Sequence, residues 1–98
     1  MNIEKTFENN NLTLMPQGRL DSITSQEFET AIEDNIGDAT SLVLDLKNLD
    51  YISSAGLRVL LKTQKMMNKR GEMKVLNVNE TVMEVLEMTG FVDMLNIG

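Results

Sequence analysis

The pattern of apolar and polar residues begins with two strand-like segments on either side of a polar triplet. Ile3–Glu8 and Leu12–Gly18 flank three consecutive asparagines. Asparagine tolerates the left-handed backbone of tight turns, so this arrangement predicts a hairpin that turns at the triplet. Pro16 has no amide donor, which predicts that the second strand is frayed or lies at an edge there.

The segment after this hairpin has the spacing of a helix. Its apolar residues fall at i, i+3 and i+4: Phe28, Ala31 and Ile32. Thr24 and Glu27 have the spacing of a capping box, which predicts that Thr24 caps the start of the helix. Gly37 is the expected end.

Two short apolar runs, Ser41–Leu46 and Met73–Val78, have the pattern of buried strands. The first is nearly continuous and rich in strand-forming residues, which is typical of a strand buried on both faces in a parallel sheet. A helix is predicted over Leu57–Arg70 between the two runs, ended by Gly71.

A last helix is predicted after the second run. Asn79 is its expected cap, Val82, Val85 and Leu86 are expected on its buried side, and Gly90 is the expected end. The apolar tail that follows is expected to pack back on the core. The element order β-β-α-β-α-β-α predicts one α/β domain over residues 1–98, a mixed sheet covered by helices.

Composition narrows the functions that this domain can have. The 98 residues include nine basic and fifteen acidic ones, a net charge of −6, which argues against general capture of nucleic acid or anionic membrane. The absence of cysteine and histidine excludes disulfides, a Ser-His-Asp triad and imidazole zinc sites, and we expect no metal or cofactor. With no secretory signal and no run near ~18 apolar residues, a cytoplasmic location is expected.

Basic residues are concentrated on one side of the helix predicted over Leu57–Arg70. One arc of that helix is expected to face the sheet: Leu57, Leu60, Leu61, Gln64 and Met67. The opposite arc is basic: Arg58, Lys62, Lys65 and Lys69. Between the two arcs lies a strip of small or apolar groups: Ala55, Val59, Thr63 and Met66. The basic arc is either a solvated face or a docking surface, with Val59 and Met66 supplying apolar contact beside the lysines.

Ser53 and Ser54 stand immediately before this helix. A hydroxyl at that place accepts one of the backbone N–H groups that lack a helical partner, which stabilises a helix by roughly 0.5–2 kcal/mol. The same place would also accept a phosphate, because the helix dipole and Arg58 favour added negative charge. The two serines are therefore either a cap or a switch.

The stretch "LVLDLKNLDYISSAGLRVLL" resembles the signature of the STAS domain of bacterial anti-anti-sigma factors (anti-sigma factor antagonists). "GRLDSITSQEF" and "VLNVNETVMEVLEMTGF" are similar to two further segments of that family. The resemblance implies a partner-switching module. The unphosphorylated form binds an anti-sigma factor that is also a serine kinase, phosphorylation at the start of the helix releases it, and a serine phosphatase restores binding.

The chain departs from the family pattern at two positions. The family's aspartate is Ser53 here, and the usual phosphate acceptor, immediately before the glycine, is Ala55. Ser54 is therefore the first candidate for phosphorylation and Ser53 the second. The partner-binding residues expected around them are these: Ser53, Ser54, Ala55, Arg58, Val59, Lys62 and Met66. The free protein is expected to be a monomer.

Two other functions remain open at this point. An enzyme would need an activated serine or a magnesium site built from Asp21, Asp45 and Asp50. Neither a Ser-x-x-Lys motif nor a phosphate-binding glycine loop is present, so we expect no catalysis. The other alternative, supported by Ala55, is a non-phosphorylated STAS scaffold or a small-ligand-sensing module in a regulatory complex.

Overall fold

The chain alternates strands and helices, and the computed structural model describes all of residues 1–98. The strands are β1 (Ile3–Glu8), β2 (Asn11–Pro16), β3 (Gly18–Leu20), β4 (Ser41–Asp45), β5 (Leu49–Ile52) and β6 (Glu72–Leu76). The helices are α1 (Thr24–Ile36), α2 (Ser54–Asn68), α3 (Glu80–Met88) and a 3-10 turn, η1 (Phe91–Asp93). This order confirms the predicted α/β class and adds two short strands, β3 and β5.

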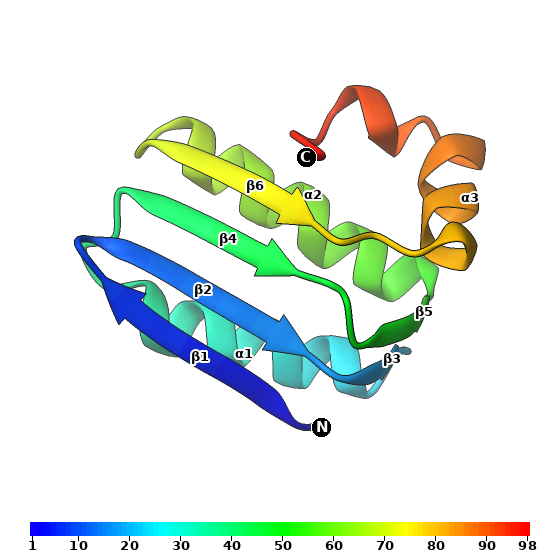
Figure 1. The fold of residues 1–98 in the computed structure, drawn as a ribbon, viewed down its shortest axis with the longest axis horizontal. Helices are drawn as coiled ribbons and strands as arrows, with labels where there is room; N and C mark the ends of the chain where they lie inside the picture. Colours follow the sequence, from blue (N-terminus) through cyan, green and yellow to red (C-terminus); the bar gives the residue numbers. More distant parts are fainter.

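Four of the strands form one mixed sheet in the order β1-β2-β4-β6 (Figure 1). β1 and β2 are antiparallel, and β2, β4 and β6 are parallel to one another. β3 and β5 continue beyond the ends of β2 and β4 and pair with each other in parallel. Both α1 and α2 therefore begin at the same end of the sheet, after β3 and β5 respectively.

The hairpin turns where the sequence predicts it. Asn9 and Asn10 have φ angles of 51° and 63°, the left-handed region that asparagine tolerates better than most residues. Pro16 is the last residue of β2, two residues beyond the final pair that β2 forms with β4, Leu14 with Leu44. Its missing donor therefore falls where the parallel pairing has already ended.

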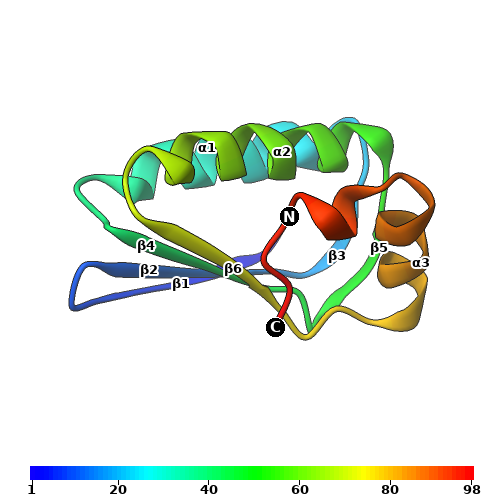
Figure 2. The same cartoon turned by 90° about the horizontal axis from the view of Figure 1, so that it is seen from above.

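Only one face of the sheet is covered by helices. Figure 2 shows α1 and α2 side by side on one face, and α3 at the end of the domain next to β5. Burial alternates along β4, with Leu42 and Leu44 fully buried and Val43 partly exposed between them. The prediction that this strand is buried on both faces is wrong, because no element covers the second face.

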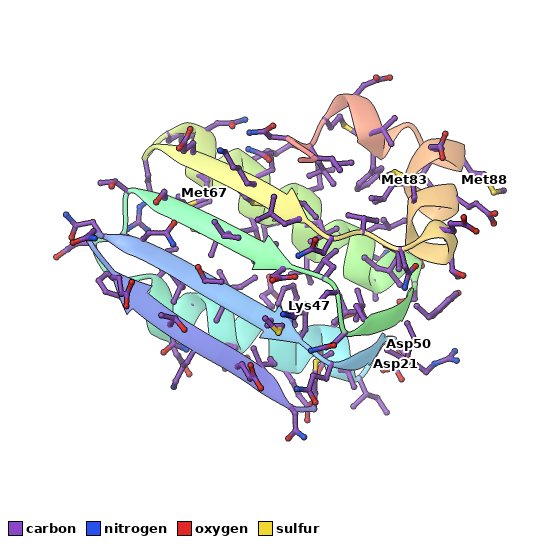
Figure 3. All side chains as sticks on the ribbon, in the orientation of Figure 1. Asp21, Lys47, Asp50, Met67, Met83 and Met88 are labelled. Atoms are coloured by element: carbon purple, nitrogen blue, oxygen red, sulfur yellow. The ribbon has the colours of Figure 1, made fainter.

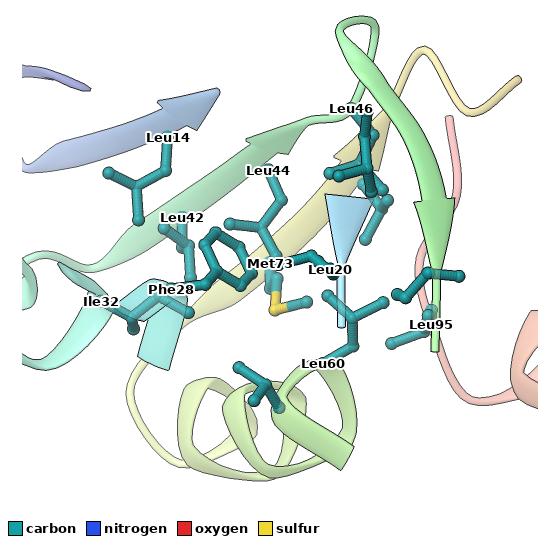
Figure 4. Close-up of a cluster of buried hydrophobic side chains, with 14 of the residues drawn as sticks. Leu14, Leu20, Phe28, Ile32, Leu42, Leu44, Leu46, Leu60, Met73 and Leu95 are labelled. Atoms are coloured by element: carbon teal, nitrogen blue, oxygen red, sulfur yellow. The ribbon is translucent and has the colours of Figure 1, made fainter. Parts of the chain in front are cut away.

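The core lies between the sheet and the two long helices (Figure 4). Phe28 of α1 and Leu60 of α2 are fully buried and lie over Leu42 and Leu44 of β4. Burial of each such side chain is worth roughly 1.5–3 kcal/mol. The periodicity of the helices and the pattern of the strands therefore converge on one core.

The start of α1 differs from the predicted capping box. Thr24 is the first helical residue, and its hydroxyl donates to the carbonyl of Arg19. Asp21 caps the helix instead, because its Oδ1 accepts the backbone N–H groups of Ile23 and Thr24, both at 2.9 Å. These bonds hold the pKa of the Asp21 carboxyl below its ordinary value. Gly37 ends the helix as predicted, with a φ angle of 44°.

α3 and the tail follow the prediction closely. The Oδ1 of Asn79 accepts the N–H of Val82 at 2.8 Å, so Asn79 is the cap. Its Nδ2 donates to the carbonyl of Leu49 at 2.7 Å, which ties the start of α3 to β5. In the tail, Leu95 is buried in the core and Ile97 pairs with Val75 of β6. No helix combines the length and the hydrophobicity that a membrane span requires.

Candidate functional site

The junction between β5 and α2 is held by a backbone hydrogen bond to β3 and by a side-chain cap on the helix. The N–H of Ser53 donates to the carbonyl of Leu20 at 2.8 Å, so the chain that leaves β5 is still bonded to β3. Ser53 has extended backbone, and its Oγ accepts the N–H of Gly56 through a long hydrogen bond of 3.4 Å. Ser53 is therefore the helix cap. α2 begins at Ser54, three residues earlier than predicted.

Ser54 is exposed and its hydroxyl has no hydrogen bond. It is the first residue of a helix of 15 residues, so its side chain stands at the positive end of the helix dipole. The backbone N–H groups of Ser54 and Ala55 have no acceptor either. The structure thus separates the two serines: one caps the helix, and the other is free and open to solvent.

Gly56 sets how closely the first turn of α2 approaches the strands. A Cβ on Gly56 would lie 2.7 Å from Cγ1 of Ile52 and 3.0 Å from Cβ of Leu20. Both distances are shorter than ordinary carbon contacts. A glycine is needed at this position, because the first turn of α2 lies directly against β3 and β5.

The basic arc of α2 lies on the surface as predicted. Arg58, Lys62, Lys65 and Lys69 are all exposed. Only Lys62 has an ion pair, with Nζ 2.7 Å from Oε2 of Glu29 on α1. The hydrogen bond and the charge of Glu29 raise the pKa of Lys62 above its ordinary value. The other three cations have no acidic partner, so most of the positive charge of the arc is not neutralised.

The apolar strip beside this arc is less exposed than the sequence predicts. Val59 is only 7 % exposed and belongs to the hydrophobic core, and Thr63 is 5 % exposed with its hydroxyl donating to the carbonyl of Val59. Met66 is half-buried and packs against the core. α1 lies against this side of α2, so the strip is largely a contact between helices. The expectation that Val59 offers an open apolar contact is corrected.

A groove of about 300 Å³ runs between the first turns of α1 and α2. Its lining is mainly polar: Ser22, Ser25, Gln26, Glu29, Ala55, Arg58, Val59 and Lys62. Four of these residues, Ser22 just before α1 and three from α1 itself, are absent from the site predicted from sequence. They are some 30 residues away from α2 along the chain, and no local pattern shows that the two helices lie side by side.

The three aspartates considered for a magnesium site are not gathered into one. Asp21 caps α1, and Asp45 accepts from the Nδ2 of Asn77 at 3.0 Å. Asp50 is exposed, and Figure 3 shows it with Asp21 at the end of the molecule formed by β3 and β5. No three acidic residues lie close enough together to hold a metal ion.

Comparisons with known proteins agree with this architecture. The family model of the STAS domain matches residues 2–98. The anti-sigma F factor antagonist of Paenibacillus polymyxa is 33% identical over 102 residues, covering 99% of this chain and 87% of that protein.

Two solved structures share the fold. An anti-sigma factor antagonist from Mycobacterium paratuberculosis has a TM-score of 0.88 at 21% identity, covering 98% of this chain and 83% of that one. The anti-sigma factor antagonist SpoIIAA in its unphosphorylated form has a TM-score of 0.82 at 17% identity, covering 99% and 88%. Because the family match spans nearly every residue, the chain described here belongs to the STAS domain family.

Proposed function

We propose that this protein is an anti-sigma factor antagonist, and that the start of α2 controls its binding to an anti-sigma factor. The relative from Paenibacillus polymyxa carries that function in its name. The observation that carries the proposal is the position of Ser54, exposed and without a hydrogen bond at the positive end of α2. The three unpaired cations of the basic arc extend from Arg58, one turn after Ser54, along α2 to its far end, and they suit a partner with an acidic surface.

In the proposed mechanism the unphosphorylated protein binds an anti-sigma factor that is also a serine kinase. Transfer of phosphate to Ser54 would add about 1.5–2 negative charges at the edge of the docking surface. The charge would lie against an acidic partner and repel it, while the helix dipole and Arg58 keep α2 stable. A serine phosphatase would restore binding. SpoIIAA, which shares the fold, has also been solved in a phosphorylated form.

Ser54 suits the role of acceptor better than Ser53 does. The Ser53 hydroxyl is half-buried and accepts the Gly56 N–H, so phosphate on it would remove the cap of α2. Phosphate on Ser54 removes no existing bond. The rest of the proposed docking surface is the basic arc, with Ala55 and Met66 as partly exposed contacts and Val59 behind them.

Two substitutions at Ser54 test this proposal. Ser54→Ala should bind the anti-sigma factor as the parent does, and Ser54→Asp should bind it at least about tenfold more weakly, because like charges then face each other. Thr81→Asp is the matched control, since it adds the same charge at an exposed position in the first turn of α3. Equal binding by the parent, Ser54→Asp and Thr81→Asp, measured by calorimetry, would refute control through Ser54.

A second function, a scaffold or ligand-sensing module without phosphorylation, is favoured by one observation. Ala55, which has no hydroxyl, stands where the resemblance places the usual acceptor. Incubation with ATP and a kinase encoded near this protein, followed by mass spectrometry, separates the two. Phosphate on Ser54 supports switching; no phosphate on Ser53 or Ser54, together with tight binding to the kinase-like partner, supports the scaffold.

A further inference from the structure

α3 carries negative charge along one side and has no basic residue to balance it. Three of its exposed residues are acidic and follow at i, i+4 and i+7: Glu80, Glu84 and Glu87. Residues at this spacing lie in one line on a helix, where like charges repel each other. None of the three takes part in an ion pair, and Glu87 lies near the last turn, where the helix dipole disfavours an anion. A positively charged group from outside the domain would relieve this repulsion.

Methionines border this line on both sides. Met83 is half-buried, whereas Met88 is 86 % exposed and points away from the domain (Figure 3). Met83 and the three glutamates line a groove of about 300 Å³. Methionine adapts its shape to apolar partners and is common at binding surfaces. The acidic face of α3, which we define as the three glutamates with Met83 and Met88, therefore combines charge with accessible apolar surface.

The basic arc of α2 has the complementary charge. α2 contains no acidic residue, and three of the four cations in the arc have no acidic partner. Lys69, Lys65 and Lys62, taken from the end of α2 backwards, follow at intervals of four and three residues. The glutamates of α3 follow at the same intervals in the forward direction. Two helices packed antiparallel through these faces therefore place each glutamate opposite a lysine over about 10 Å.

The two faces cannot meet within one molecule as it is folded. α2 lies on the sheet beside α1, whereas α3 stands at the end of the domain, next to β5 (Figure 2). No ion pair joins α2 to α3. The acidic residues of α1 are less suited to the same role, because Glu29 already pairs with Lys62 at 2.7 Å and Glu27 lies 3.1 Å from the N-terminal amine.

We propose that the acidic face of α3 docks on the basic arc of α2 in a second copy of this protein. The two faces differ, so the contact is heterologous and each molecule offers one face of each kind. One pair of helices covers less than the ~1,200–2,000 Å² that a stable interface buries, so the association is weak. The protein is therefore a monomer in dilute solution and self-associates when it is concentrated.

Sedimentation velocity at a series of protein and salt concentrations tests the association. At low salt we expect the mean sedimentation coefficient to rise at protein concentrations on the order of 0.1–1 mM, because a contact this small is weak. The rise should disappear at about 1 M salt, where the Debye length is only about 3 Å. A protein that stays monomeric over this range, or an association that salt strengthens, would overturn the proposal.

Two charge reversals identify the faces. Glu84→Lys with Glu87→Lys removes the acidic face, and Lys65→Glu with Lys69→Glu removes most of the unpaired charge of the basic arc. Each variant alone should associate at least about tenfold more weakly than the parent, because like charges then face each other. A mixture of the two should associate again, since one variant supplies the basic arc and the other the acidic face. A mixture that stays monomeric would overturn the pairing of these two faces.

Glu4→Lys with Glu8→Lys is the matched control for the acidic face. It makes the same change in net charge at exposed positions on β1. Both pairs of substitutions reduce the net negative charge, which by itself favours association. The control should therefore associate at least as strongly as the parent, whereas Glu84→Lys with Glu87→Lys should not. Equal association of the two variants would show that the α3 face is not the contact.

Self-association should compete with the partner, a consequence that rests on the proposed function because both contacts use the basic arc. Glu84→Lys with Glu87→Lys should bind the anti-sigma factor as the parent does in dilute solution, and about threefold or more tightly at concentrations where the parent self-associates. If the two bind equally at both concentrations while the parent self-associates, the self-contact stands and the competition is refuted. If no anti-sigma factor binds either protein, the proposed function fails and the sedimentation result remains.

Discussion

Gly56 and Ile52 are in closer contact than any side chain at position 56 would allow. A Cβ on Gly56 would lie 2.7 Å from Cγ1 of Ile52, and a third residue, Leu20, closes the other side at 3.0 Å. Gly56→Ala should therefore lower the free energy of unfolding by about 1–3 kcal/mol, as overpacking of a core usually does. Urea unfolding measures it. Ser54→Ala, two residues away and exposed, is the control and should change stability by less than about 0.5 kcal/mol.

Asn79 caps α3 and ties it to β5, so replacing it should remove both the cap and the tie. Asn79→Ala removes the acceptor for the N–H of Val82 and the donor to the carbonyl of Leu49. We expect a loss of about 0.5–2 kcal/mol from the cap alone, and more from the second bond. Thermal unfolding measures it, with the exposed Thr81→Ala in the same helix as control. A loss no larger than that of Thr81→Ala would show that the cap contributes little.

Asp21 should make stability depend on pH in the acidic range. Its pKa is lowered in the folded protein by the N–H groups of Thr24 and Ile23, so the folded state favours the carboxylate. The contribution is complete above the ordinary aspartate pKa of about 3.9 and is lost as pH falls through the lowered folded pKa. The difference in unfolding free energy between the parent and Asp21→Asn should therefore shrink with decreasing pH.

A control at another aspartate isolates this effect. Asp50 is exposed and its carboxylate accepts no hydrogen bond, so Asp50→Asn is the control for the same substitution at an aspartate that caps no helix. Chemical unfolding at a series of pH values measures the three proteins together. If the unfolding free energy of Asp21→Asn depends on pH in the same way as that of the parent, the Asp21 carboxylate does not stabilise the start of α1.

The basic arc of α2 should contribute to partner binding through charge. Lys62→Glu with Lys65→Glu should reduce affinity for an anti-sigma factor about tenfold or more and should flatten its dependence on salt, since attraction becomes repulsion. The control pair, Lys47→Glu with Lys74→Glu, makes the same change in net charge at exposed positions outside α2. Binding curves that match the parent at low and high salt would assign the α2 lysines to a solvated face.

Local patterns in the sequence were sufficient to predict the helices and the hairpin. The three α-helices follow from apolar spacing of 3.6 residues and from local end signals such as Asn79 and Gly37, because caps and stops act over three or four residues. The hairpin at Asn9 and Asn10 follows from the same kind of local preference. The family resemblance added an expected role for the β5–α2 junction, which the two serines alone left open between cap and switch.

The short strands and the burial of individual side chains required the tertiary structure. β3 and β5 have only three and four residues, too few to show a period, and exist because they pair with each other. Leu42, Val43 and Leu44 are equally apolar, so composition could not tell which of them faces α1 and α2. The open face of the sheet is a result of where the helices lie.

The sequence by itself determined the helices, the hairpin, the basic arc of α2 and the two serines at its start, because each depends on residues within a few positions of one another. Only the tertiary structure decided that Ser53 is the cap and Ser54 is free, that Val59 is covered by α1, and that Ser25 and Arg58 line one groove. The last two relationships join residues about 30 positions apart. They arise from packing of α1 against α2 on the sheet, which no local pattern records.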